Sequence, residues 1–347
     1  MVVGLETVNF FDFVQDQIPI VEDRMRDQSN GHHPDLEMAL HHLLSSGGKR
    51  IRPTVTLLVG GMLGASPEHV VTLAAAVELL HTATLVHDDV IDGSLLRRGS
   101  PTLNARWSPG ATILTGDFIF ARAAKLAAET ESIEVMKLFA KTLSVIVNGE
   151  ITQLFISKGL VNTDDYYRRI YAKTASLFEL CTVAPVFLSG GDRDMIDTME
   201  RFGYEVGMAF QIVDDILDFT SDQNELGKPV ANDLRQGLVT LPALHYLEMF
   251  PDDPEIKAVI ENRIVSEESI VKVVEAIKES GAVHSSMQEA RKFINRGLDA
   301  LHHVPDTPER QALEALANFV VDRNIYNGNF KYGAAVHVNA SFFATNC

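Results

Sequence analysis

The sequence predicts an all-α protein, and three observations support this prediction. Apolar residues recur mostly at steps of three and four along the 347 residues, which is the spacing of a buried helix face. No segment shows the regular alternation that is typical of strands. No stretch rich in Pro, Gly and Ser divides the chain. We therefore expect one all-helical domain of about a dozen helices over residues 1–326, followed by an irregular tail over 327–347.

The ends of several helices can be read directly. Ser66 is a favourable N-cap, with Pro67 at the first helical position and Glu68 in the first turn. A second helix is expected from Thr163 to the glycine pair that begins at Gly190, because Gly is favoured just after a helix. The other expected helices are 34–46, 111–130, 132–156, 194–219 and several amphipathic helices from Ser269 to the region of Arg323.

Three irregular segments interrupt the helical pattern, at residues 45–53, 93–110 and 221–237. All three are rich in cations or glycine, and the last two directly follow acidic motifs at predicted helix ends. Loops that a rigid scaffold holds in place are where binding groups are expected.

Composition excludes some classes of protein. The chain has 30 basic and 47 acidic residues and a net charge of −17, which argues against general nucleic-acid binding. An anionic small substrate remains possible, because local cations or bound metals can reverse the field inside a pocket. Cys181 and Cys347 are the only cysteines, so we expect no disulfide framework and no zinc site.

The N-terminus, MVVGLETVNFFDFVQDQ, lacks the basic region of a signal peptide. The longest apolar run, residues 71–86, is broken by Glu78 and His81 and is shorter than a bilayer span. We expect it to be a buried helix of a soluble, cytoplasmic protein with no integral membrane segment.

Two acidic motifs carry the functional signal. Asp88 and Asp92 are four residues apart on a predicted helix, with Asp89 between them, so their carboxylates share one face. Like charges at this spacing repel by a few tenths of a kcal/mol per pair, on the order of 0.2–0.5, unless a cation lies between them. The same pattern recurs at Asp214, Asp215 and Asp218, and both motifs are embedded in apolar residues.

A single motif of this kind is weak evidence for a metal site. Two copies, each followed by a cationic loop, favour Mg²⁺, which binds one or two carboxylates and completes its shell with water and phosphate oxygens. The expected object is a magnesium–diphosphate cluster between two facing helices. Each nearby cation taken alone is more often a surface residue, but together they can bind two anionic groups: Lys49, Arg50, Arg52, Arg97, Arg98, Lys173 and Lys228.

Five motifs resemble those of a known family. The segments GGKRIRP, ELLHTATLVHDDVIDGSLLRRGSPT, YAKTASLF, FQIVDDILDF and GKPVANDLRQGLVTLP occur together and in order. Over roughly residues 5 to 325 the chain resembles the trans-isoprenyl diphosphate synthases, or polyprenyl synthetases. The resemblance implies an isoprenoid synthase fold of about ten core helices around a deep central cavity, usually in a homodimer. It also implies head-to-tail addition of isopentenyl diphosphate to an allylic diphosphate, with three Mg²⁺ ions per site once substrate is bound.

The resemblance also implies residue roles. Asp88, Asp92 and Asp214 are the expected metal ligands; Asp89 supports the first two, and Asp215 and Asp218 lie near Asp214. The isopentenyl diphosphate site is expected at Lys49, Arg52, His81 and Arg98. The clamp on the allylic diphosphate is expected at Arg97, Lys173 and Lys228. Thr174 and Gln211 are expected to hold oxygens beside the developing carbocation. No side chain is assigned as a dedicated base, because the oxygens of pyrophosphate are the expected proton acceptor. His87 is expected to have a structural role.

Two features bear on product length. Ala83 and Thr84, one helical turn before Asp88, are small where relatives with short products carry a bulky aromatic residue. The segment between Asp89 and Asp92 also lacks the two-residue insertion that many bacterial short-chain enzymes have in the first motif. Both features favour products longer than geranylgeranyl diphosphate. Phe139 lies about 17–21 Å below Glu150 and Gln153 on the same helix face. It is either the floor of the product tunnel or an ordinary core residue.

Other functions remain open. A geranylgeranyl or farnesyl diphosphate synthase, or the catalytic subunit of a heteromeric synthase, is compatible with the same motifs. A class I terpene cyclase is disfavoured, because its second metal motif carries Asn, Ser and Glu. A non-catalytic partner subunit is disfavoured, because all six aspartates are present.

Overall fold

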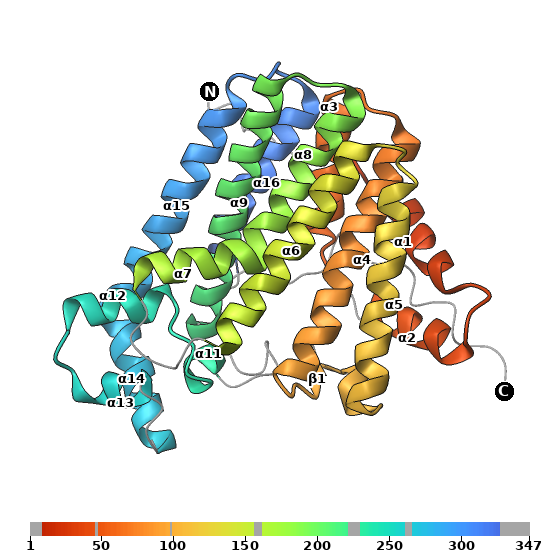
Figure 1. Cartoon of the computed structure of the whole chain (residues 1–347). Coiled ribbons are helices and arrows are strands. Elements are labelled where there is room, and N and C mark those ends of the chain that lie inside the picture. Colours follow the sequence, from red (N-terminus) through yellow and green to blue (C-terminus); the bar gives the residue numbers. More distant parts are fainter. Residues whose placement is uncertain are drawn as a thin grey trace, which may run out of the picture.

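Long helices lie side by side through most of the chain in the computed structural model (Figure 1). The structure describes residues 9–45, 48–97, 99–155, 162–220, 230–260 and 266–326, and side chains as far as residue 322. The predicted all-α class is confirmed. Among the described residues the only strands are β1 (Leu96–Arg97) and β2 (Ser100–Pro101), an antiparallel pair within the segment that we expected to be irregular.

The helices of the first half are α1 (Gln17–Arg26), α2 (Pro34–Ser45), α3 (Ile51–Met62), α4 (Pro67–Ile91), α5 (Pro109–Ala128) and α6 (Ile133–Phe155). The next are α7 (Thr163–Ile170), α8 (Ser176–Ser189) and α9 (Arg193–Thr220). Shorter helices follow: α11 (Asn232–Arg235), α12 (Leu241–Met249), α13 (Pro254–Ile260) and α14 (Glu267–Glu279). The described part of the chain ends with α15 (Ala282–Leu301) and α16 (Pro308–Tyr326).

Helix α4 lies at the centre of the core. Every residue from Val70 to Leu80 is buried, Glu78 included, and the helix packs against α3, α5 and α8. It is long and apolar enough to cross a membrane by length and composition, but 78% of the apolar window is buried by other helices. A helix that is apolar all round is typical of a protein core. The prediction of a buried helix at 71–86 is confirmed.

The helix expected from Thr163 to Gly190 is divided by a π-helical turn. Helix α7 begins at Thr163, after Asn162 accepts a hydrogen bond from the Asp165 N–H, and α8 ends where Gly190 adopts φ +72°. Between them Tyr171–Ala175 form a π turn. The apolar period does not reveal such a turn, because one extra residue shifts the helix face without interrupting it. π turns are frequently found at functional sites.

Helix α9 packs unusually closely against this π turn and α8. A Cβ atom added at Gly207 would lie 2.6 Å from Ala175 Cα, and one added at Gly203 would lie 2.9 Å from Glu179 Cα. Glycine is therefore needed at both positions for the two backbones to meet. This contact fixes the π turn against the helix that carries the second acidic motif.

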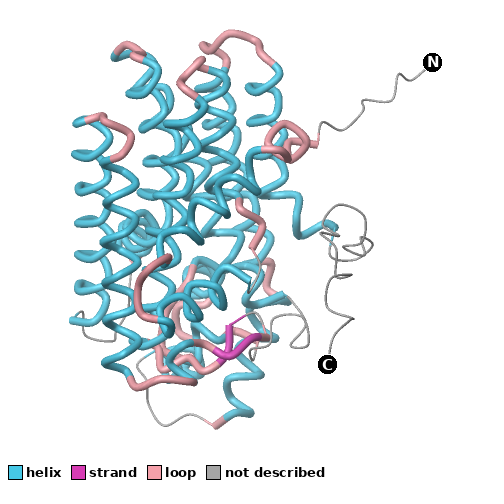
Figure 2. The backbone as a smooth tube through the Cα atoms, turned by 90° about the vertical axis from the view of Figure 1, so that its right-hand side faces the viewer, coloured by secondary structure: helices cyan, strands magenta, loops and turns pink. Residues whose placement is uncertain are grey.

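Both acidic motifs lie at the C-terminal ends of their helices, α4 and α9, and in Figure 1 both ends point toward the lower part of the molecule. The turned view in Figure 2 shows the strand pair in the same lower half. The helical scaffold thus brings the two motifs to one end of the bundle, although they are more than a hundred residues apart in the sequence.

We predict that Gly207→Ala lowers the free energy of unfolding by about 1–3 kcal/mol, because overpacking forces α9 away from the π turn. Gly110→Ala is the matched control. It also lies in a helix, has nothing within 4 Å of an added Cβ and should leave stability unchanged or slightly higher. Denaturant unfolding of the two variants measures the difference. Equal stability would show that the helices are not held this closely.

Candidate active site

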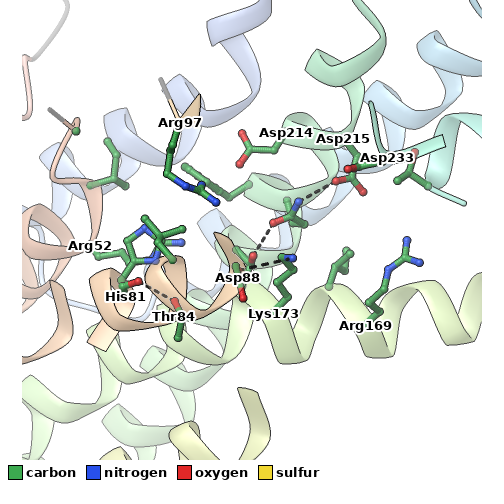
Figure 3. A pocket seen from close by; sticks show the side chains of 18 of the residues that line it. Arg52, His81, Thr84, Asp88, Arg97, Arg169, Lys173, Asp214, Asp215 and Asp233 are labelled. Atoms are coloured by element: carbon green, nitrogen blue, oxygen red, sulfur yellow. Dashed lines mark hydrogen bonds and ion pairs between the residues drawn. The ribbon is translucent and has the colours of Figure 1, made fainter. Parts of the chain in front are cut away.

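Most of the predicted site residues line one cavity of about 710 Å³. It lies between the C-terminal ends of α4 and α9, the N-terminus of α3, the α7–π turn segment, the loop around α11, and α16. Figure 3 shows Asp88 and Lys173 close together, with Asp214 across from them and Asp215, Asp233 and Arg169 farther along. The predicted residues in the lining are Lys49, Arg50, Arg52, His81, Thr84, Asp88, Asp92, Arg97, Lys173, Thr174, Gln211, Asp214 and Asp215.

Other predicted residues lie elsewhere. Asp89 is buried behind the cavity wall, where its Oδ1 accepts hydrogen bonds from Arg97 at 2.9 and 3.0 Å. The Asp218 carboxylate accepts the backbone N–H groups of Asn232 and Asp233 and so caps α11. Ala83 and Phe139 are buried in the core. Arg98, Lys228 and the tail 327–347 lie outside the described residues.

Asp88 is a largely buried carboxyl at the edge of the cavity. Its side chain is only 14% exposed, and its Oδ2 lies 4.0 Å from Lys173 Nζ. Burial is the largest cause that raises the pKa of the Asp88 carboxyl to about 6; Glu150 and Asp92 act in the same direction, and Lys173 opposes them. Burial lowers the pKa of Lys173, but the carboxylates of Asp88 and Glu150 raise it more, so the net shift is upward. The lysine remains a cation.

In the cationic loop before α3 and the first turn of that helix, Arg50 forms hydrogen bonds within the protein, whereas Lys49 and Arg52 lie against aromatic rings at the cavity. Arg50 has left-handed backbone angles (φ 48°), and its guanidinium turns toward the protein. It donates to Glu22 Oε1 at 2.8 Å, Glu78 Oε1 at 3.1 Å and the Leu44 carbonyl at 3.0 Å. These bonds connect α1, α2 and α4 to the loop. The sequence places Arg50 among the candidate diphosphate-binding cations; the residue does line the cavity, and its hydrogen bonds to the protein also make it an anchor for the loop.

Lys49 and Arg52 lie against aromatic rings at the cavity. Arg52 Cζ is 5.3 Å from the Phe178 ring and 5.8 Å from the Phe210 ring. Its Nε is buried and has no hydrogen-bond acceptor among the described residues. Lys49 Nζ is 5.5 Å from the Phe319 ring. A partly buried guanidinium whose buried Nε donor is unused, held against rings at a cavity, fits an anionic ligand.

The other end of the cavity contains a chain of hydrogen bonds between side chains. Thr174 Oγ1 donates to Gln211 Oε1 at 2.5 Å, and Gln211 Nε2 donates to Asp215 Oδ1 at 2.8 Å. Tyr166 Oη donates to Asp215 Oδ2 at 2.8 Å. Burial and the nearby Asp233 raise the pKa of Asp215 to about 7, although both hydrogen bonds oppose this shift.

His87 has a structural position, in agreement with the prediction. Its Nε2 lies 3.1 Å from the Ile113 carbonyl oxygen, and its ring occupies the space where a side chain at Gly116 would lie. The ring therefore packs α4 against α5 and is directed away from the residues of the cavity.

Sequence reasoning missed several lining residues. Arg169 precedes Lys173 by one helical turn, and this i, i+4 spacing was a usable signal. Asp233 lies inside the motif GKPVANDLRQG, but nothing local assigned it to the cavity. Phe319 and Val320 come from α16, far away in sequence, and only the tertiary structure brings them to the site.

The donor set fits Mg²⁺ that is bound together with a diphosphate. Asp88, Asp92 and Asp214 supply hard oxygen ligands around the cavity. Within the described ranges, no three acidic, His or Cys side chains converge closely enough to hold a metal ion by themselves. Mg²⁺ usually takes only one or two protein carboxylates and completes its shell with water and substrate phosphate. The cations opposite these carboxylates are suited to the same phosphate groups.

Comparisons with known proteins agree with this chemistry. The sequence model of the polyprenyl synthetase family matches residues 33–277. Octaprenyl diphosphate synthase of Escherichia coli is 37% identical over 288 residues, covering 82% of this chain and 88% of that protein. Heptaprenyl diphosphate synthase component 2 of Bacillus subtilis is 35% identical over 314 residues, or 90% of each chain.

A solved structure is also closely similar. The polyprenyl synthase of Caulobacter crescentus, in complex with calcium and isoprenyl diphosphate, superposes with a TM-score of 0.86 at 34% identity. The match covers 90% of this chain and 97% of that one. The predicted isoprenoid synthase fold is confirmed.

We predict that metal affinity falls as the pH drops through about 6. The pKa of Asp88 is raised to about 6, so below this pH its carboxyl is protonated and a cation must displace the proton. Calorimetry with Mg²⁺ and inorganic pyrophosphate at pH 5 to 8, in two buffers, measures affinity and proton release. Lys173→Met should move the midpoint upward, because the lysine cation lowers the pKa of Asp88.

Lys137→Met, at an exposed ion pair on α6, is the control and should leave the midpoint unchanged. A midpoint that is the same in Lys173→Met and the unsubstituted chain would contradict the assignment of the transition to Asp88.

Proposed function

The chain belongs to the polyprenyl synthetase family and is a trans-prenyltransferase, and on this premise we propose its reaction in detail. It adds isopentenyl diphosphate head to tail to an allylic diphosphate, with Mg²⁺, and makes an all-trans polyprenyl diphosphate longer than geranylgeranyl diphosphate. The observation that carries this proposal is a single cavity in which the carboxylates of two helix ends face two separate groups of cations.

Two diphosphate groups can be held at once. Lys173 and Arg97 lie beside the first acidic motif, where an allylic diphosphate would bind together with Mg²⁺ on Asp88, Asp92 and Asp214. The metal, when bound, neutralises charge on the departing pyrophosphate. Lys49, Arg52 and His81 form the second group and would bind isopentenyl diphosphate. Arg98 and Lys228 are proposed to join these groups on the basis of sequence alone.

The residues of the cavity then govern the bond changes. The allylic C–O bond breaks, and its electron pair leaves with the pyrophosphate. Oxygens of Thr174 and Gln211 face the carbocation that remains. The π electrons of isopentenyl diphosphate form the new C–C bond, and a proton passes to a pyrophosphate oxygen. Apolar neighbours such as Leu85 and Ile170 help to exclude water, which would otherwise capture the cation.

Product length follows from the small residues before Asp88. Thr84 lines the cavity, and Ala83 beside it is completely buried, so neither blocks the space beneath the motif. We propose Phe139, only 2% exposed on α6, as a floor that stops elongation. Relatives named octaprenyl, heptaprenyl and solanesyl diphosphate synthase support a long product.

We further propose a cytoplasmic homodimer. Six large apolar side chains on the described parts of α5 and α6 are between 43% and 85% exposed, and these helices lie on the same side of the bundle (Figure 1). Large apolar side chains exposed on neighbouring helices are candidates for a protein interface. The residues are Ile113, Leu114, Val147, Ile151, Leu154 and Phe155. The relative named component 2 favours a second candidate, in which this chain is one component of a heteromeric synthase.

We predict that the purified chain alone, with Mg²⁺, farnesyl diphosphate and isopentenyl diphosphate, forms linear prenyl diphosphates beyond geranylgeranyl. Mass spectrometry of the products measures this. Asp214→Asn should lower the rate about a hundredfold or more, since it removes a metal ligand. Asp197→Asn, an exposed aspartate on the same helix, should have no effect. Product that requires an added second subunit would favour the heteromeric candidate, and cyclic hydrocarbons would favour a terpene cyclase.

We predict that Thr84→Phe shortens the products, because an aromatic ring would fill the cavity one turn below Asp88. Thr84→Ser keeps the volume small and should leave the distribution unchanged. Phe139→Ala should lengthen the products. Chromatography of the dephosphorylated prenols measures the product lengths of all three variants. An unchanged distribution in Phe139→Ala would mean that Phe139 is an ordinary core residue.

A further inference from the structure

Tyr166 begins a chain of hydrogen bonds that ends at the carbocation site. It lies on α7, is completely buried and does not line the cavity. Its hydroxyl donates to Asp215 Oδ2 at 2.8 Å, and its ring packs 5.6 Å from Tyr167 and 5.5 Å from the Arg169 guanidinium. Neither the sequence motifs nor the proposed mechanism uses this residue.

Asp215 is held by two protein donors. Its Oδ2 accepts from Tyr166 and its Oδ1 from Gln211 Nε2, each at 2.8 Å. Gln211 precedes Asp215 by one helical turn on α9, so both side chains lie on one face. The carboxylate therefore has a fixed orientation, which suits it to fixing another residue rather than to following a metal ion.

The orientation of Gln211 follows from this bond. The amide nitrogen of Gln211 points toward Asp215 and its carbonyl oxygen toward Thr174. An ionised carboxylate only accepts hydrogen bonds, so ionised Asp215 favours this orientation over the reversed amide. Thr174 Oγ1 donates to the Gln211 carbonyl oxygen at 2.5 Å. A hydroxyl has one hydrogen and two lone pairs. Because the hydrogen is used inside the protein, Thr174 can present only lone pairs to the cavity.

We propose that Tyr166 is a positioning residue that acts through Asp215 and Gln211 to keep the oxygen lone pairs of Thr174 directed at the reacting carbon. The inference rests on the proposed function of the cavity. Lone pairs in a fixed direction stabilise a developing positive charge at no reorganisation cost. If Gln211 reversed its amide, N–H groups would face Thr174, and the Thr174 hydrogen would be free to point into the cavity.

The arrangement depends on Tyr166 because Asp215 is buried. Without the tyrosine hydroxyl, Oδ2 loses its Tyr166 donor at a site that is only 4% exposed. The carboxylate then gains by rotating toward another donor, and Gln211 follows it. Tyr166→Phe keeps the ring, and with it the packing against Arg169 and Tyr167, and removes only the hydroxyl.

The test compares Tyr166→Phe with Tyr167→Phe. Tyr167 is the next residue on the same helix, is partly buried and packs against Phe293 on α15, away from the hydrogen-bond chain. Tyr166→Phe should lower kcat about tenfold, the effect of one lost buried hydrogen bond. It should change the KM of each diphosphate substrate by no more than about twofold, because neither diphosphate group is expected to contact this series of hydrogen-bonded side chains. Tyr167→Phe should retain the kcat of the unsubstituted enzyme.

A double-mutant cycle distinguishes positioning from general destabilisation. In a Thr174→Val background, Tyr166→Phe should lower kcat no further, because the group through which it acts is already gone. Multiplicative losses, or an unchanged kcat in Tyr166→Phe alone, overturn the proposal.

A second readout does not depend on turnover. The side-chain NH₂ resonances of ¹⁵N-labelled glutamine, assigned for Gln211 by their loss in Gln211→Glu, should shift in Tyr166→Phe and not in Tyr167→Phe. Unchanged resonances refute the positioning role even if the unsubstituted chain proves inactive. If the chain forms no product even with a second subunit, while the resonances shift, the proposed function is rejected and the positioning of Gln211 is retained.

Discussion

The structure depends on the concentration of negative charge in one partly buried cavity. Two acidic motifs end α4 and α9, where the helix dipoles already present partial negative charge. Lysine and arginine side chains line the same cavity, and Lys173 is 4.0 Å from Asp88, yet burial still raises the pKa of Asp88 to about 6. The carboxylates of the cavity are hard oxygen ligands of the kind that Mg²⁺ prefers. A divalent cation bound there would neutralise charge on a diphosphate and so favour its departure.

The aspartates of each acidic motif have different structural roles. In the first, Asp88 and Asp92 face the cavity while Asp89 holds Arg97 from behind. In the second, Asp214 faces the cavity, Asp215 orients Gln211, and Asp218 caps α11. Asp89, Asp215 and Asp218 thus attach neighbouring side chains and a loop to the same helices that carry the proposed metal ligands. Arg50 has the equivalent role for the loop that carries Lys49 and Arg52.

Much of this could be predicted from the sequence, because the signals are local. The apolar period located the long helices, Ser66 and Pro67 marked the start of α4, and Gly190 marked the end of α8. The repeated aspartates at helical spacing, each followed by cations, indicated a metal–diphosphate site, and their spacing correctly predicted that Asp88 and Asp92 share a face. Helix period, end signals and i, i+4 geometry are properties of short segments, and folding does not alter them.

Other features exist only in the tertiary structure. The sequence by itself determined the all-helical class, the two acidic motifs and the cations available to them. It could not show that Arg50 turns toward Glu22 and Glu78, that the helix after Thr163 contains a π turn, or that Phe319 reaches the cavity from α16. The sequence also offered no reason to single out Tyr166 from the other six tyrosines. Each of these depends on a contact between residues distant in the chain, and such contacts are decided by packing, which no local pattern encodes.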